Sequence, residues 1–292
     1  MSDTPLVTYK GNCHCGAFQF SFNTPEIKTT TTCNCSMCSK VRSIVAAVDM
    51  QAHTKIQTGY MWAAFRGDEN FKILKGDESA LTTYNFGKGL LTHKFCATCG
   101  TSILARQKDP SLSNGVSLLV NIRTVTDGID FAALEPGFVF NGAAIGDPYQ
   151  EPAHVPIPDG ADTPENAVVY HGACHCGDVA YTMQNPGKIT SAMECNCSIC
   201  WRDAGVWVYP KTSYFTFRGV PDAVTEYTFG NGVTFHAFCK KCGVAMYERF
   251  LWEPFADKTA VSVRTIEGLK MADIEVEKWD GRTHKGLYVC PA

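Results

Sequence analysis

The chain has 292 residues, of which 45% are hydrophobic and 19% charged, values typical of a globular protein with room for two domains. Its formal net charge is −3, which gives no indication of binding to nucleic acid or to an anionic membrane. The polar start and the lack of a long apolar run predict neither a signal peptide nor a membrane helix, so we expect a cytoplasmic protein. Fifteen cysteines in a reducing compartment indicate metal binding rather than disulfides.

In chain order, the first landmark is a Gly-x-Cys-His-Cys-Gly motif at residues 11–16, followed by a strand with period-two alternation at 17–22. A Cys-x-Cys-Ser-x-Cys cluster follows at 33–38, and we expect a short helix after it. Residues 93–100 read His-Lys-Phe-Cys-Ala-Thr-Cys-Gly, which is typical of a zinc knuckle. A segment rich in Pro, Gly and Asp at 146–166 then predicts an extended linker.

The remainder of the chain repeats these landmarks in the same order. The three motifs recur at 172–177, 195–200 and 236–243, so the chain is a tandem duplication. Most other segments are short and rich in β-branched and aromatic residues, which predicts a mainly β fold with few short helices. We therefore expect one domain over residues 1–145 and a second over 167–292.

The two copies differ in length between their second and third clusters. The second landmark is offset by 162 residues between the copies and the third by 143, so the first copy has 19 extra residues. We expect this surplus within residues 49–70. A lid over the site and a neutral surface insertion are equally compatible with it.

Cysteine spacing first predicts a closed metal site in each repeat. A Cys-x-x-Cys-Gly knuckle supplies two ligands, and a tetrahedral structural zinc needs two more, which the earlier Cys-His-Cys motif can provide. Such a site would stabilise a small β domain through its metal-binding free energy. The predicted structural ligands are Cys13, Cys15, Cys96 and Cys99 in the first repeat and Cys174, Cys176, Cys239 and Cys242 in the second.

Three cysteines then remain in each repeat, close together in sequence. Three protein ligands and one open position are typical of a catalytic zinc, and the open position can accept water or an exogenous thiol. A thiol bound to zinc is deprotonated at neutral pH. The predicted ligands, which are also the predicted catalytic residues, are Cys33, Cys35 and Cys38, and Cys195, Cys197 and Cys200, giving up to four zinc ions per chain.

Alternatives remain for both kinds of site. Disulfide or redox chemistry is the alternative for the four-cysteine sites, and a structural zinc completed by a histidine is the alternative for the three-cysteine sites. The recurring histidines are compatible with a fourth ligand, a partner of a ligand, or simple packing. They are His14, His93, His175 and His236.

Three further residues have less specific patterns. Arg123 and Arg264 recur on expected strands and are compatible with carboxylate binding or with a structural ion pair. Cys290 has no counterpart in the first repeat, and we expect it to be a bystander.

The seven ordered cysteines of each repeat resemble the pattern of the glutathione-dependent formaldehyde-activating enzyme family, which includes centromere protein V. The resemblance covers nearly the whole chain, twice over, and implies two tandem zinc-stabilised β-tent domains. It implies a carbon–sulfur lyase that joins formaldehyde to glutathione, its co-substrate, as S-hydroxymethylglutathione. It also implies the same division of the cysteines into structural and catalytic zinc ligands.

The sequence departs from the family pattern after the catalytic cluster, where a basic pair and a glycine are usual. The second repeat keeps Arg202 and Gly205, whereas the first has Ser43 at the glycine position, so we expect the second site to be the more active if only one is. A non-catalytic zinc-stapled scaffold, or a related zinc enzyme with another substrate, is the alternative function. The expected partners are a small-molecule thiol and a small electrophile, and the sequence does not indicate an oligomeric state.

Overall fold

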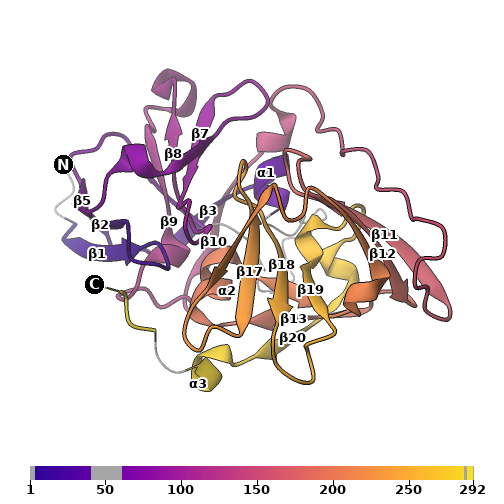
Figure 1. Ribbon diagram of the computed structural model, residues 1–292. Helices are drawn as coiled ribbons and strands as arrows, with labels where there is room; N and C mark the ends of the chain where they lie inside the picture. Colours follow the sequence, from indigo (N-terminus) through magenta and orange to yellow (C-terminus); the bar gives the residue numbers. More distant parts are fainter. Residues whose placement is uncertain (1–3, 41–60, 286–287, 292) are drawn as a thin grey trace.

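The computed structural model describes residues 4–40, 61–285 and 288–291, and this part of the chain is mainly β, as predicted. We call residues up to 145 the first half and residues from 167 the second half. Figure 1 shows the two halves side by side, with both chain ends on the side of the first half. No helix among the described residues has the length and apolarity needed to cross a membrane.

The first half forms two sheets. A three-stranded sheet has the order β1-β2-β5, and a seven-stranded sheet has the order β10-β3-β4-β9-β8-β7-β6 in the described residues. Its pairs are antiparallel except for β10 and β3, which are parallel. The strands are β1 (Leu6–Asn12), β2 (Gln19–Pro25), β3 (Thr29–Cys33), β4 (Trp62–Phe65), β5 (Phe71–Lys75), β6 (Thr82–Tyr84), β7 (Leu91–Phe95), β8 (Ser102–Gln107), β9 (Leu118–Asn121) and β10 (Glu135–Phe140).

The second half has the same topology. Its described strands form a three-stranded sheet, β11-β12-β15, and a seven-stranded sheet, β16-β17-β18-β19-β14-β13-β20, in which β13 and β20 are the parallel pair. The strands are β11 (Ala167–Ala173), β12 (Ala180–Pro186), β13 (Ser191–Cys195), β14 (Val206–Val208), β15 (Phe215–Arg218), β16 (Val224–Thr228), β17 (Thr234–Cys239), β18 (Ala245–Phe250), β19 (Thr259–Ser262) and β20 (Glu275–Trp279).

The helices are short, and the most important ones begin inside the three-cysteine clusters. Each begins at the serine of Cys-x-Cys-Ser-x-Cys, directly after the cluster's second cysteine. The α-helices are α1 (Ser36–Lys40), α2 (Ser198–Asp203) and α3 (Gly281–Lys285). The 3₁₀ helices are η1 (Glu78–Ala80), η2 (Pro110–Ser113), η3 (Ile122–Thr124), η4 (Gly142–Ala144), η5 (Thr212–Tyr214), η6 (Val263–Thr265) and η7 (Met271–Asp273).

The two halves pack reciprocally through their knuckles. Gly100 lies against Phe238 of the second half, and Gly243 lies against Phe95 of the first, so that a Cβ added to either glycine would lie within 2.7 Å of the ring. The two phenylalanine rings meet edge to face at 6.2 Å. Helix α1 contacts η6, and α2 contacts η3. Contacts that repeat with the partners exchanged describe a two-fold relation within one chain.

Two expectations on local structure need correction. Arg123 and Arg264 lie in η3 and η6, directly after β9 and β19, rather than on strands. Trp62 begins β4, which pairs with β9 as β14 pairs with β19, so residues 62–65 belong to the repeated core and not to the surplus. Residues 49–60 of the expected insertion lie outside the described residues. The domain boundaries at 145 and 167 stay a prediction.

Candidate metal centres

The predicted four-cysteine sets come together in both halves. In each set the four Sγ atoms lie within 4.8 Å of one another. The closest sulfur pairs, such as Cys15 and Cys96 at 3.5 Å, are far longer than a disulfide of about 2.05 Å. They are close to the roughly 3.8 Å edge of a tetrahedron with metal–sulfur bonds of about 2.3 Å. All fifteen cysteines are described, and none of them forms a disulfide.

The backbone around these sites explains why the knuckles have glycines. Gly100 has φ +74° and Gly243 has φ +73°, a conformation that side chains other than glycine rarely adopt. Each glycine N–H donates to the carbonyl of the first knuckle cysteine at 2.9 Å. The amides of Phe18 and Val179 donate to the sulfurs of Cys13 and Cys174 at 3.3 Å. Such amide donors stabilise thiolates that bind a cation.

The two three-cysteine groups also come together. We call Cys33, Cys35 and Cys38 cluster one, and Cys195, Cys197 and Cys200 cluster two. Within each cluster the sulfurs lie within 4.8 Å of one another, and among the described residues no fourth His, Cys, Asp or Glu lies that close to all three. In cluster two, however, Cys200 alone also forms a group of this kind with His236 and Glu248. The arrangement fits a cation with three protein ligands and one position for a ligand from outside.

The charge state of cluster one also fits a cation. Hydrogen bonds with Cys35 and Cys38 lower the pKa of the Cys33 thiol to about 3. The pKa of Cys35 rises to about 12, mainly through its hydrogen bond with Cys33. Without a cation, hydrogen bonding among the three sulfurs therefore favours one thiolate over three. A bound divalent metal ion would supply the positive charge needed to ionise all three.

A loop that the sequence comparison missed lies behind each cluster. A Cβ on Gly142 would come within 2.6 Å of the Cys33 sulfur, and one on Gly281 within 2.7 Å of the Cys195 sulfur. The asparagine of each Cys-Asn-Cys motif holds this loop. Asn34 Nδ2 donates to Asn141 Oδ1 at 2.8 Å, and Asn196 makes the matching bond to Asp280 at 2.9 Å. Aligning Asn-Gly with Asp-Gly across the repeats would have identified it.

Cys35 of cluster one lies in the wall of a cavity of about 640 Å³, which we call cavity one. Residues of both halves and of the segment between them form its walls. Cys35 and Lys40 line it from the first half, and Arg264 and Met271 line it from the second. Lys40 is buried and pairs with Glu151 at 2.6 Å. The cavity thus combines a cluster cysteine with cationic and apolar groups.

Cluster two has a different relation to its cavity. A second cavity of about 490 Å³, cavity two, lies between α2 and the first half, and none of the three cluster cysteines is among its described lining residues. Trp201 and Arg202 line it instead. The Trp201 ring packs edge to face on Phe131 at 4.8 Å and lies under the Arg123 guanidinium at 4.7 Å. Ser39 occupies the Trp201 position in the first repeat.

The basic residue and the glycine kept after cluster two, Arg202 and Gly205, make structural contacts, and those of Arg202 reach both halves. Arg202 donates to the carbonyl oxygens of Ser198 at 2.7 Å and Asn12 at 3.3 Å. A Cβ on Gly205 would lie 2.6 Å from the Trp207 indole nitrogen, so this position requires glycine for packing. Lys40 is the counterpart of Arg202 in the first half. Ser43, the counterpart of Gly205, lies outside the described residues.

The histidines behind the clusters differ between the halves. His236 Nδ1 lies 2.9 Å from the Glu248 carboxylate, which also accepts a hydrogen bond from the Cys200 thiol at 3.2 Å. His93 faces Ala105 across the β7–β8 ladder, where His236 faces Glu248 across β17–β18. Neither ring nitrogen of His93 has a hydrogen-bond partner in the described part of the chain, and burial lowers its pKa to about 4.

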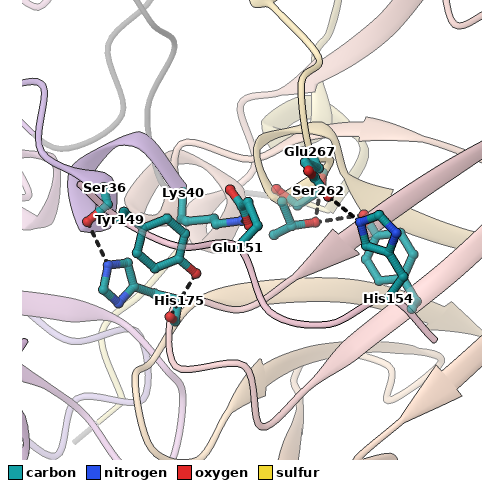
Figure 2. Close-up of polar contacts among 10 residues, drawn as sticks. Ser36, Lys40, Tyr149, Glu151, His154, His175, Ser262 and Glu267 are labelled. Atoms are coloured by element: carbon teal, nitrogen blue, oxygen red, sulfur yellow. Dashed lines mark hydrogen bonds and ion pairs between the residues drawn. The ribbon is translucent and has the colours of Figure 1, made fainter. Parts of the chain in front are cut away.

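The other pair of histidines crosses between the halves. His175, from the closed site of the second half, lies beside Ser36 of cluster one's turn, with Tyr149 alongside (Figure 2). His14 of the first half occupies the matching place beside Ser198 of the second. Neither belongs to a group of potential metal ligands among the described residues.

Cys290 lies near the first half, where its sulfur is 3.6 Å from Gln19 Nε2.

Comparison with known proteins adds a family match. The profile of the glutathione-dependent formaldehyde-activating enzyme family matches residues 8–127 and 169–282, one segment in each half. Among solved structures, a crystal structure of a Rhodobacter sphaeroides protein is 26% identical, with an alignment that covers 37% of this chain and 99% of that chain and a TM-score of 0.33.

Proposed function

Because the chain belongs to the glutathione-dependent formaldehyde-activating enzyme family, we propose that it is a zinc-dependent carbon–sulfur lyase acting at cluster one. Its substrates would be a small-molecule thiol such as glutathione and a small electrophile such as formaldehyde. The observation that carries the choice of site is cavity one, which contains Cys35 in its wall. Its volume lies within the roughly 300–1,000 Å³ usual for small-ligand sites. We keep a cytoplasmic location as part of this proposal.

The cavity suits a thiol that carries carboxylates. Lys40 and Arg264 are both at least nine-tenths buried and line the cavity, so they can pair with carboxylates of the ligand in a water-poor environment. Phe86, Ile266 and Met271 supply apolar wall that limits water around the reacting atoms. The structural zinc ligands would be the two four-cysteine sets, one in each half.

The proposed reaction forms one carbon–sulfur bond and moves one proton, with no change in the number of atoms or electrons. The thiol sulfur bonds to the carbonyl carbon of formaldehyde, the carbon–oxygen π bond breaks, and the thiol proton ends on the new hydroxyl group. Zinc held by Cys33, Cys35 and Cys38 would supply thiol deprotonation and carbonyl polarisation. The protein residues around it hold the carboxylates, orient the sulfur toward the cluster and restrict solvent.

The test is the rate at which the full chain, loaded with zinc, converts glutathione and ¹³C-formaldehyde to S-hydroxymethylglutathione, followed by NMR. We expect the rate to exceed the uncatalysed rate and to fall to it in Cys35→Ser. Glutathione that neither binds nor reacts faster would contradict the proposal and favour the zinc-stapled scaffold. Binding of glutathione without acceleration would instead favour a related enzyme with another electrophile.

A further inference from the structure

In each three-cysteine cluster, which we also call an open cluster, the serine of the turn is hydrogen-bonded by a histidine of the opposite half. His175 Nε2 lies 2.8 Å from Ser36 Oγ, and its Nδ1 lies 2.7 Å from the Tyr84 hydroxyl. Both partners belong to the first half, whereas His175 belongs to the second. A neutral imidazole has one donor and one acceptor nitrogen, so these two bonds use its full capacity and fix the ring.

The same arrangement occurs with the halves exchanged. His14 Nε2 lies 2.8 Å from Ser198 Oγ, and its Nδ1 lies 2.9 Å from the Tyr227 hydroxyl. Ser36 and Ser198 occupy the same position of the Cys-x-Cys-Ser-x-Cys motif, as do Tyr84 and Tyr227 in their strands. Two independent copies of one geometry indicate a constraint rather than incidental packing.

Aromatic groups from outside its own half enclose each histidine, with Tyr149 coming from the segment between the halves. The His175 ring stacks on Tyr149 at 4.7 Å and meets Phe86 edge to face at 4.7 Å. The Tyr149 hydroxyl also donates to the His175 carbonyl at 2.9 Å. Tyr288 does the same for His14 at 2.6 Å. The two histidines are 6% and 1% exposed, so neither can leave its cage without repacking.

Each histidine is also fixed at its other end. His175 lies between Cys174 and Cys176, two members of the four-cysteine set of the second half. Ser36 directly follows Cys35 of cluster one. A closed site in one half therefore connects, through one imidazole, to an open cluster in the other half.

We propose that His175 and His14 are positioning residues that act across the halves, each setting the geometry of the open cluster of the other half. The duplicated chain is then the smallest unit that contains complete open clusters. A single copy of the repeat would need a second copy to supply the histidine.

Site-resolved alkylation tests this proposal without any turnover, so a failure of the proposed enzymatic function would leave the test intact. The full chain with its metal is treated with iodoacetamide, and labelling of each cysteine is followed by peptide mass spectrometry. We expect His175→Ala to speed labelling of cluster one by about tenfold, as loss of a ligand-orienting partner does, and to leave cluster two unchanged. His14→Ala should give the mirror result.

Two further variants separate positioning from a general loss of folding. Ser36→Ala should reproduce the cluster-one effect, and combining it with His175→Ala should add nothing, because both changes break one interaction. His175→Gln, which keeps a donor and an acceptor, should restore most of the protection. The proposal is overturned if His175→Ala speeds labelling only within its own four-cysteine set, if Ser36→Ala leaves cluster one unchanged, or if no labelling rate changes.

Discussion

Clusters one and two have the same three cysteines, the same serine and the same supporting loop, yet their surroundings have diverged. Cluster one lies in the wall of a cavity that also contains Lys40 and Arg264. Behind cluster two, Glu248 bonds Cys200 and His236, and Trp201 lies beside it in the cavity wall. The comparison teaches that duplication preserved the pattern of cysteines, whereas the cavity beside each cluster differs. It favours the first site as the reactive one, where the sequence favoured the second.

The largest expected effect is on stability. It tests whether the two four-cysteine sets stabilise the fold equally, in contrast to the two three-cysteine clusters, whose surroundings differ. Cys99→Ser and Cys242→Ser should each unfold a large part of the protein, because a structural zinc site contributes apparent binding free energies of about 10–16 kcal/mol. Calorimetry should show similar losses for the two variants. Cys290→Ser, outside both sets, is the control and should melt like the wild type. Wild-type melting of either knuckle variant would show that its site does not stabilise the fold.

The next effect separates the two clusters by activity. Cys35→Ser should lower turnover by more than about 100-fold, beyond the loss expected for an outer partner of a metal ligand. Cys197→Ser should keep most of the turnover. Elemental analysis should show that each variant loses one zinc of four. Equal loss of turnover in the two variants would contradict the division of roles, and two zinc ions in the wild type would remove the open metal sites altogether.

The carboxylate behind cluster two should matter for stability rather than for turnover. Glu248 is 5% exposed, and Glu248→Ala leaves the buried His236 without this partner, which should cost about 1–3 kcal/mol. Urea unfolding measures the loss, and turnover should stay at the wild-type value. Ala105→Glu, the reverse change at a fully buried position of the first half, should destabilise the protein without improving turnover. A large loss of turnover in Glu248→Ala would place chemistry at cluster two.

The smallest expected effect compares two residues at equivalent positions. Lys40→Met should raise the dissociation constant of glutathione about tenfold, equivalent to about 1.4 kcal/mol, because one cation of cavity one is lost. Arg202→Met is the matched control in the second half and should leave the affinity unchanged. Isothermal titration calorimetry measures both. A larger loss of glutathione affinity in Arg202→Met than in Lys40→Met would indicate that the thiol binds in cavity two.

The sequence predicted which cysteines come together, and their use as metal ligands stays a prediction. The three-cysteine clusters are local in sequence, whereas the four-cysteine sets were assigned by counting the ligands that a tetrahedral zinc needs. The strand predicted at 17–22 from period-two alternation overlaps β2. These features required no knowledge of how the two halves pack.

What the sequence did not indicate depends on contacts between distant segments. His14 and Ser198 are 184 positions apart and meet only because the halves pack reciprocally. Glu248 reaches His236 through the register of β17 and β18, which no spacing in the sequence specifies. The expectation for the second site rested on Arg202 and Gly205. In the structure Arg202 bonds backbone carbonyls, lies over the Tyr288 ring and lines cavity two, and Gly205 packs against an indole ring.

The most direct test of the central claim is a crystal structure of the zinc-loaded full chain soaked with glutathione. The account predicts zinc at cluster one with the glutathione sulfur in its open position, and glutathione carboxylates near Lys40 and Arg264. Glutathione sulfur at cluster two alone, or a protein side chain in the open position of cluster one, would contradict it.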